Sequence, residues 1–201
     1  DFACPTLVAL NETPCIEVVT VVTQPDRPKG RQLIPHSSPI KLEAESHRLR
    51  VHQPERLRND ISFLEQLAPD LIVVAAYGQI LPQAILKLPL PGCLNVHGSL
   101  PPAYRGAAPI QHAILDGQAG TGVTIMQMDA GLDTGAIISK VATPIESTDN
   151  AQILHDRLAK LGAELLLETI PLHNAGKIAA TPHDDTPATY PDQPTRDTGT
   201  N

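Results

Sequence analysis

Short apolar runs that alternate with stretches of helical spacing constrain the fold more than any other feature of this sequence. The runs from Val18 to Thr23, Leu71 to Ala75 and Cys93 to His97 indicate three buried strands. Between them, Ile40 to Leu49 and Asp60 to Leu67 carry apolar residues at helical intervals, with Asp60 placed as an N-cap. Such alternation is typical of βαβ units. We therefore expect an α/β fold with a mostly parallel sheet and helices on both faces.

The second half of the chain continues this pattern. Ala108 to Leu115 has helical spacing and is closed by Gly117. Gly122 to Met128 and Ala136 to Val141 indicate two more strands, and Asn150 to Ile170 is the longest predicted helix. One face of that helix is leucine-rich, which suits packing against a sheet.

Composition sets the domain organisation and the cellular class. The chain has 201 residues, of which 41% are hydrophobic and only 2% aromatic, so the core must be mainly aliphatic. Beyond Thr181 the composition shifts to Pro, Asp and Thr, which predicts one domain over 1–181 and a loose tail over 182–201. No apolar stretch is long enough for a membrane span, and no signal peptide is evident. Three cysteines without C-x-x-C spacing favour reduced thiols over a disulfide framework or a zinc site.

Charge is unevenly distributed along the chain. The formal net charge is −7, yet residues 24–58 carry a net +4, so the remainder carries −11. A solvated surface is the ordinary interpretation of such a segment. A contact with phosphate groups is the alternative.

The stretch "LNVHGSLPPAYRGAAPI", residues 94–110, begins at the end of a predicted strand. Ligands of open α/β sheets bind beyond the carboxyl ends of the strands. Because side chains alternate along a strand, Asn95 and His97 are expected to point to the same side. An amide and an imidazole placed together can stabilise a developing oxyanion. The alternative is a structural polar pair.

A carboxylate for this site is expected from "MDAGLDTGAI", residues 128–137, which lies between two predicted strands. From spacing alone, an ordinary hairpin turn with aspartates at turn positions is the favoured interpretation. However, Gly131 and Gly135 would let the loop approach a ligand closely. Asp133 lies deeper in the loop than Asp129 and is our candidate for orienting His97 and accepting a proton.

Three motifs carry a resemblance to a known family. The run "NVHGSLPPAYRGAAPIQHAILDGQAGTGVTIMQMDAGLDTG", with "TQPDRPKGR" and "VVAAYGQILP", resembles the amino-terminal catalytic domain of the methionyl-tRNA formyltransferase family, from Asp1 to about Tyr190. The resemblance implies a Rossmann-like, doubly wound domain that transfers a formyl group from 10-formyltetrahydrofolate to methionine esterified to initiator tRNA. The family's catalytic residues fall on Asn95, His97 and Asp133.

The same resemblance implies two binding segments and no metal. The folate-contacting segment falls on Ser99, Leu100, Pro101 and Pro102. Pro101 replaces the family's usual leucine, and its ring removes a backbone N–H. The loop that enters the acceptor stem of the tRNA supplies Arg27, Lys29 and Arg31, in agreement with the positive segment.

The family context also predicts what surrounds these 201 residues. The resemblance implies that they open at the first helix, with Asp1 as its N-cap and the first strand missing, and that the family's carboxy-terminal β-barrel domain is absent. We therefore expect marginal stability and weak tRNA binding of the chain alone. We also expect a monomer in the bacterial cytosol or an organelle matrix, without membrane contact.

Two alternatives remain open at this point. Other enzymes that use 10-formyltetrahydrofolate share Asn-x-His and a later Asp, and they act on glycinamide ribonucleotide, on an aminosugar nucleotide or on water. A truncated remnant without catalytic activity is the second alternative.

Overall fold

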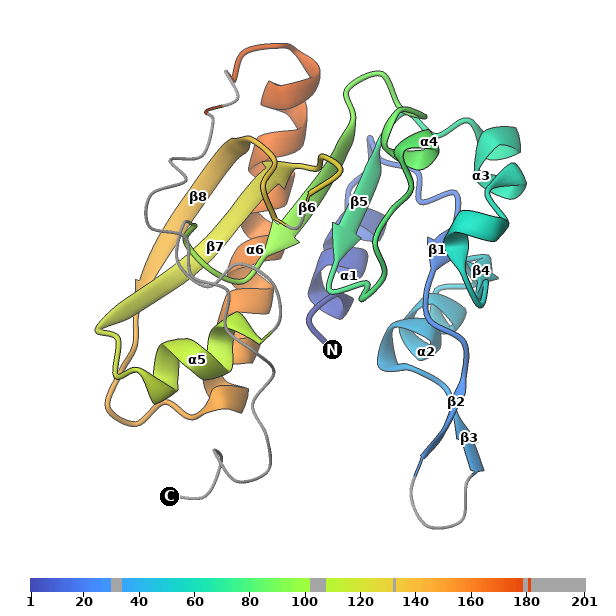
Figure 1. Ribbon diagram of the computed structural model, residues 1–201. Coiled ribbons are helices and arrows are strands. Elements are labelled where there is room, and N and C mark those ends of the chain that lie inside the picture. Colours follow the sequence, from blue (N-terminus) through green and yellow to red (C-terminus); the bar gives the residue numbers. More distant parts are fainter. Residues whose placement is uncertain (30–33, 102–107, 132, 179–180, 182–201) are drawn as a thin grey trace.

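The computed structural model describes residues 1–29, 34–101, 108–131, 133–178 and 181, and Figure 1 shows their arrangement. Strands within these ranges are β1 (Val21–Val22), β2 (Arg27–Lys29), β3 (Ile34–His36), β4 (Val51–His52), β5 (Ile72–Ala75), β6 (Cys93–His97), β7 (Gly120–Gln127) and β8 (Ile137–Pro144). Helices are α1 (Cys4–Glu12), α2 (Pro39–Ser46), the 3-10 helix η1 (Leu57–Asn59), α3 (Ser62–Leu67), α4 (Gln83–Leu86), α5 (Pro109–Leu115) and α6 (Ala151–Asn174).

In the described part of the chain the strands form three separate sheets. The largest has the order β5-β6-β7-β8, with β5 and β6 parallel and the other two pairs antiparallel. β1 and β4 form a parallel pair, and β2 and β3 form an antiparallel hairpin. The predicted α/β class is confirmed, but the sheet is more mixed than expected. β7 and β8 are joined by a short loop, and strands joined in this way run antiparallel.

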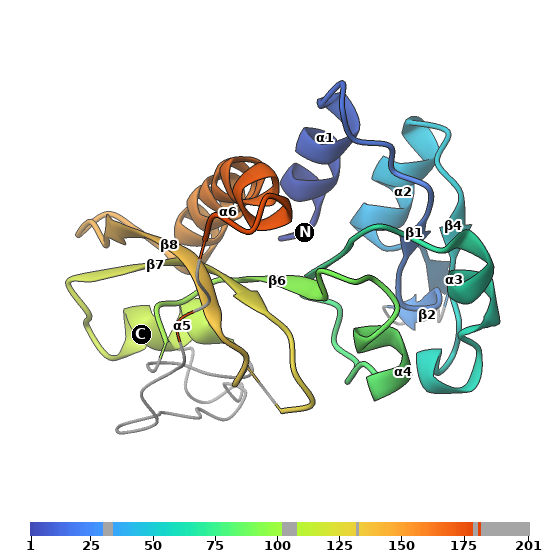
Figure 2. The same ribbon diagram turned by 90° about the horizontal axis from the view of Figure 1, so that it is seen from above.

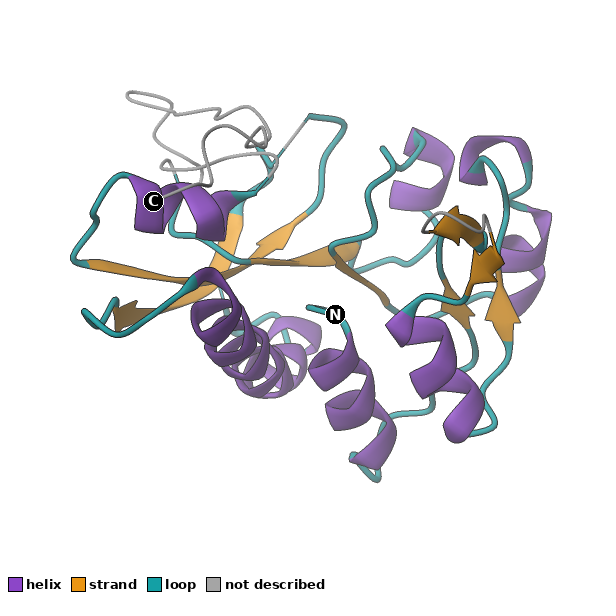
Figure 3. Ribbon diagram, turned by 90° about the horizontal axis from the view of Figure 1, so that it is seen from below, coloured by secondary structure: helices purple, strands orange, loops and turns teal. Residues whose placement is uncertain are grey.

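Helices cover both faces of the largest sheet, as predicted. Figures 2 and 3 show α1 and α6 on one face and α5 on the other. The main core lies between α6 and the sheet, where strand side chains meet a leucine stripe of the helix. Its fully buried members include Leu94, Val123, Ile125, Leu154, Leu158 and Leu166.

Helix α6 lies close to β6 because a glycine faces the sheet. A Cβ built on Gly162 would lie 2.7 Å from Cγ1 of Val96, closer than real Cβ atoms approach. The helix begins as predicted, since the Asn150 side chain accepts a hydrogen bond of 2.9 Å from the backbone N–H of Ile153. The close approach of Gly162 to Val96 holds β6, the strand that carries Asn95 and His97, against the long helix α6.

Two predicted helix caps are wrong. Ile61 is the N-cap of α3, while Asp60 accepts a bond from the Ser62 hydroxyl at 3.4 Å, because a 3-10 turn precedes that helix. Ala3 is the N-cap of α1, and Asp1 instead accepts from the backbone N–H of Ala3 at 3.2 Å.

The β2–β3 hairpin was not predicted from the sequence. Two prolines, Pro28 and Pro35, face each other across the hairpin, and neither can donate a ladder hydrogen bond. Figure 1 shows this hairpin extending away from the rest of the molecule. The predicted loose tail, 182–201, lies outside the described residues. Among the described helices, none combines the length and the apolar character that crossing a bilayer requires.

Candidate functional site

Three polar side chains from distant parts of the sequence meet at the end of β6. Asn95 donates from Nδ2 to Oδ1 of Asp133 at 3.2 Å. Nδ1 of His97 lies 3.7 Å from Oδ2 of the same carboxylate. Both strand residues therefore face one side, as the alternation of the strand predicted. The His97 and Asp133 side chains are only 8% and 13% exposed, so their electrostatic interaction is weakly screened by solvent.

The loop between β7 and β8 brings Asp133 to this position. Asp133 has a left-handed backbone conformation, with φ of 52°. Asp129 instead stabilises the turn, since its Oδ1 accepts from the backbone N–H of Gly131 at 2.9 Å and from the Thr134 hydroxyl at 2.7 Å. A Cβ on Gly135 would collide with the carbonyl oxygen of Gln127, so only glycine fits there without a backbone shift. The two aspartates thus occupy different environments.

Thr124 supports the site from the neighbouring strand. It is paired with His97 in the β6–β7 register, and its hydroxyl donates to the carbonyl oxygen of Ser99 at 2.8 Å. Both Thr124 and Ser99 are fully buried. Thr124 therefore fixes the chain just after β6. It was missed from the sequence because its role depends on an antiparallel register that no local pattern specifies.

The predicted folate segment follows β6 directly. Ser99 and Pro101 are buried, and Leu100 is half-buried. The Leu100 side chain packs on Gly122 of β7, where an ideal Cβ would lie 2.8 Å from Leu100 Cδ2. Pro102 lies outside the described residues. The segment is thus anchored to the same strand that supports His97.

A second polar cluster holds the base of the β2–β3 hairpin. Asp26, just before β2, accepts from Nζ of Lys41 at 2.7 Å, from Nε2 of Gln53 at 2.8 Å and from the hydroxyl of Ser37, just after β3, at 3.3 Å. The hydrogen bond from Lys41 is the main reason that the pKa of Asp26 lies below its usual value. We call Asp26, Ser37, Lys41 and Gln53 the hairpin-base cluster.

The predicted tRNA-contacting residues lie on or beside this hairpin. Arg27 and Lys29 belong to β2, whereas Arg31 lies outside the described residues. Arg27 forms an exposed ion pair of 2.9 Å with Glu55. Exposed pairs of this kind contribute little to stability, so Arg27 can exchange this partner for another anion at low cost.

Cys93, at the other end of β6, does not fit the role of a nucleophile. It is fully buried, and this burial raises the pKa of its thiol to about 11. The reactive thiolate is therefore rare at neutral pH. Among the described residues, no three His, Cys, Asp or Glu side chains come together as a group that could hold a metal ion.

The geometry suits one class of chemistry. An amide that donates hydrogen bonds, a titratable imidazole and a carboxylate can together hold an oxyanion and move a proton. The site lies at the carboxyl end of β6, where loops meet in α/β folds.

Comparison with known proteins gives consistent matches. The model of a family described as formyl transferase matches residues 5–170. A methionyl-tRNA formyltransferase of Geobacter sulfurreducens is 50% identical over 194 residues, which cover 94% of this chain and 60% of the relative. That of Halorhodospira halophila is 52% identical over 200 residues, covering 98% of this chain and 64% of the relative.

A solved structure shares the fold. The formyltransferase PseJ from Anoxybacillus kamchatkensis, in complex with UDP-4,6-dideoxy-4-formamido-L-AltNAc and tetrahydrofolate, superposes with a TM-score of 0.62. It is 26% identical, and the match covers 85% of this chain and 84% of that one. This chain thus spans about 60% of the length of the curated relatives but most of the length of this solved structure.

Proposed function

Because the chain belongs to the formyl transferase family, we propose that it transfers a formyl group from 10-formyltetrahydrofolate to the amino group of methionine esterified to initiator tRNA. The meeting of Asn95, His97 and Asp133 at the end of β6 is the observation that carries this proposal. The high identity to methionyl-tRNA formyltransferases, compared with 26% to the sugar-nucleotide enzyme, supports the choice of acceptor.

The reaction follows from the chemistry of these three side chains. The uncharged amine attacks the formyl carbon, and the carbonyl oxygen becomes an oxyanion in a tetrahedral intermediate. Asn95 has a second amide hydrogen besides the one given to Asp133, and a protonated His97 ring carries an N–H on Nε2 as well as on Nδ1, so both side chains can donate to this oxyanion. The proton lost by the amine passes to Asp133, directly or through one water. Collapse of the intermediate then breaks its bond to N10 of the folate, and N10 takes up the proton held by Asp133.

The folate segment is proposed to act mainly through the shape of its backbone. Ser99 is fully buried, so we assign it the role of fixing the loop. Pro101 has no backbone N–H and cannot donate to the folate. Pro102 also lacks a backbone N–H, so of these three residues only Leu100 can donate one, and recognition depends mainly on surface fit and carbonyl acceptors.

Phosphate contacts are proposed for the β2–β3 hairpin. Arg27, Lys29 and Arg31 supply three positive charges within five positions. Such charges neutralise phosphates of an acceptor stem and position it without reading its bases.

We also propose that the protein acts as a monomer in a reducing compartment, either the bacterial cytosol or an organelle matrix. All three proposed catalytic residues come from one chain, so the site requires no second copy. The three cysteines are all free thiols, which suits such a compartment.

Formyl transfer by the purified chain tests the proposal. Methionyl initiator tRNA, glycinamide ribonucleotide and an aminosugar nucleotide are compared as acceptors, with 10-formyltetrahydrofolate as donor. We expect transfer to the tRNA, reduced roughly 10²- to 10³-fold by Asn95→Ala or His97→Ala while the circular dichroism spectrum is unchanged. Preference for a small acceptor would overturn the choice of acceptor. An Ala variant with nearly full rate would remove that residue from the mechanism.

A further inference from the structure

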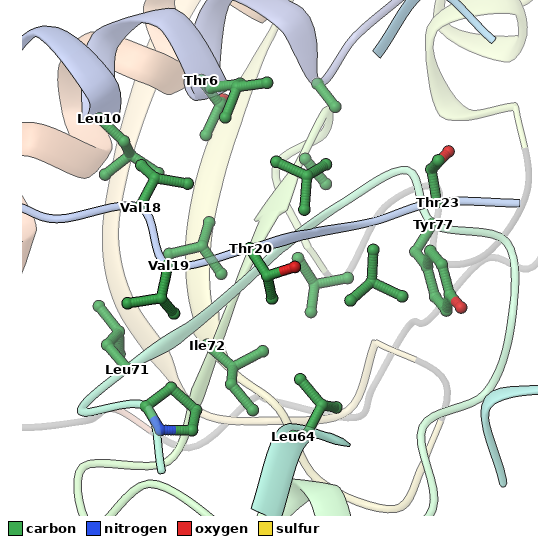
Figure 4. Close-up of a pocket in the computed structure, with 18 of the residues that line it drawn as sticks. Thr6, Leu10, Val18, Val19, Thr20, Thr23, Leu64, Leu71, Ile72 and Tyr77 are labelled. Atoms are coloured by element: carbon green, nitrogen blue, oxygen red, sulfur yellow. The ribbon is translucent and has the colours of Figure 1, made fainter. Parts of the chain in front are cut away.

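Three glutamine side chains connect the carboxyl ends of strands from two different sheets. Gln24 follows β1, Gln53 follows β4, and Gln79 lies in the loop after β5. Figure 4 shows Thr23, the residue before Gln24, beside Tyr77 of that loop, and both residues line the cavity of about 690 Å³ in this view. We call Gln24, Gln53 and Gln79 the glutamine bridge.

Gln24 is the centre of the bridge. Its Nε2 donates to the backbone carbonyl of Tyr77 at 2.8 Å, and its Oε1 accepts from Nε2 of Gln79 at 3.1 Å. Oε1 of Gln79 in turn accepts from the backbone N–H of Leu57 at 3.1 Å. A carbonyl can only accept and a backbone N–H can only donate, so these two backbone groups fix the orientation of both side-chain amides.

Gln53 anchors Gln24 from the other side. Its Nε2 donates to the backbone carbonyl of Gln24 at 2.9 Å and to Oδ1 of Asp26 at 2.8 Å. Asp26 is also bonded to Lys41 of α2. The position of Gln24 is therefore fixed by hydrogen bonds to elements outside β1.

The loop at 76–80, which we call the β5 loop, lies beside the candidate site. β5 and β6 are parallel and Ala75 is paired with Val96, so the β5 loop begins next to His97. Figure 1 shows the two strands ending at the same edge of the sheet. Ala76 has a left-handed backbone with φ of 47°, a conformation that a residue other than glycine keeps only where its surroundings hold it. The β5 loop therefore needs support from outside its own backbone.

The glutamine bridge holds this loop from one side, and a buried leucine holds its end. Leu81 lies directly after the loop and is buried in the apolar cluster that contains Leu57. Between these anchors, Ile80 is 81% exposed although it is apolar. The loop thus exposes an apolar side chain near the carboxyl edge of the sheet, where ligands of α/β folds bind.

We propose that Gln24 is a positioning residue for formyl transfer, because its hydrogen bonds to Tyr77 and Gln79 set where the β5 loop lies beside His97. Gln24 acts through the loop and does not touch the reacting atoms. This role rests on the proposed function, since the reaction takes place at the neighbouring end of β6. A loop that moves away from His97 leaves the bound reactants less well oriented, which slows the reaction of the bound complex.

Two substitutions separate the two hydrogen bonds of the Gln24 side chain. At neutral pH, Gln24→Glu keeps an acceptor for Gln79 but has no hydrogen to donate to the Tyr77 carbonyl, and Gln24→Met keeps neither bond. Gln152→Met is the control, because it removes an exposed glutamine hydrogen bond on α6, outside the bridge.

NMR relaxation and amide exchange of the folded chain report both bonds. We expect both Gln24 variants to lower the backbone order parameters of Gly78 and Ile80 from about 0.85, the value of rigid backbone, to below about 0.6. Exchange of the Leu57 amide should accelerate roughly tenfold in Gln24→Met and stay near the parent value in Gln24→Glu, because only the glutamate still holds Gln79. The control should change none of these values.

Steady-state kinetics distinguish positioning from a role in the fold alone. With saturating methionyl initiator tRNA, formyl transfer should fall roughly 10- to 100-fold in both Gln24 variants, while the KM for the tRNA is unchanged. A purely structural role would lower the thermal midpoint and leave the rate per folded molecule unchanged, which would overturn the proposal.

The order parameters also decide the proposal without the reaction. Unchanged values at Gly78 and Ile80 in both Gln24 variants would show that Gln24 does not hold the β5 loop. If one variant does not fold, the other still gives this comparison. Failure of the parent chain to formylate methionyl initiator tRNA would contradict the proposed function, whereas the NMR measurements do not depend on that activity.

Discussion

Asp133 joins the two strand residues of the candidate site and adopts a backbone conformation that asparagine tolerates better than most residues. Asp133→Asn therefore removes the charge while the loop keeps its shape. We expect formyl transfer to fall roughly 10²- to 10⁴-fold, the range for loss of a general acid–base group, with an unchanged thermal midpoint. Single-turnover rates with methionyl initiator tRNA measure the effect.

Asp129→Asn is the matched control in the same loop. Its side chain retains an acceptor oxygen for the backbone N–H of Gly131 and for Thr134, so the turn is preserved. We expect near-normal activity from this variant. Equal losses in both variants would mean that the loop needs acidic residues in general and that Asp133 has no special role.

The sequence predicted which residues meet at the site better than it predicted what supports them. Asn95, His97 and Asp133 followed from strand alternation and from a glycine-flanked loop, and the structure places all three together. Thr124 could not be found in this way, because its contact with Ser99 arises from pairing between strands. The caps assigned to Asp1 and Asp60 were wrong, since the N-cap of α1 lies two residues later, at Ala3, and that of α3 one residue later, at Ile61.

Helix α6 sets the position of β6 through Gly162, so this residue connects packing to the site. Gly162→Leu would place a side chain where even a Cβ comes within 2.7 Å of Val96. We expect a loss of about 1–3 kcal/mol in the free energy of unfolding, despite the better helix propensity of leucine. Urea denaturation measures it as a lower midpoint with an unchanged slope.

Lys160→Leu provides the control on the same helix, because Lys160 is exposed. We expect Lys160→Leu to change the free energy of unfolding by no more than about 0.5 kcal/mol. If Gly162→Leu is equally harmless, α6 can move away from the sheet and does not fix β6.

The hairpin-base cluster should determine how firmly β2 and β3 are held. We expect Asp26→Asn to accelerate amide exchange at Arg27 and His36 by roughly tenfold, because the carboxylate bonds to Lys41, Gln53 and Ser37 on three sides. The pKa of Asp26 is lowered in the folded protein, so its ionised carboxylate stabilises the fold. This stabilisation is complete above the ordinary aspartate pKa of about 3.9 and is lost as the pH falls through the lower pKa of the folded state. The parent and the variant should therefore converge only in strong acid.

Glu55→Gln is the comparison, since it removes the exposed ion pair of Arg27 and leaves the cluster intact. We expect Glu55→Gln to change amide exchange at Arg27 and His36 only slightly. A larger effect of Glu55→Gln than of Asp26→Asn would show that surface charge, and not the cluster, holds the hairpin.

Predictions of the secondary structure succeeded where one local pattern sufficed. The apolar runs at 71–75 and 93–97 are strands, and the leucine-rich stretch is the longest helix. The run at 18–23 yields only the two-residue strand β1, which among the described strands pairs with β4 alone. The hairpin at Arg27–His36 lacks apolar alternation, and nothing local distinguishes it from an irregular loop.

The uneven charge of the whole chain predicts where a polyanion binds. Arg27→Ala and Lys29→Ala should each weaken tRNA binding and reduce the slope of log K against log salt concentration by about one, since each removes one phosphate contact. Lys160→Ala, an exposed lysine on α6, is the control and should leave the slope unchanged. Unchanged slopes in the hairpin variants would mean that the tRNA uses another surface.

The position of the β2–β3 hairpin bears on how such a protein can change during evolution. Among the described strands, β2 and β3 pair only with each other, and the hairpin-base cluster is separate from the three side chains that meet at the end of β6. Insertions, deletions or exchanges between Arg27 and His36 can therefore alter the proposed acceptor contacts without altering the proposed catalytic groups. Selection can act on the choice of acceptor and on the reaction as two nearly independent traits.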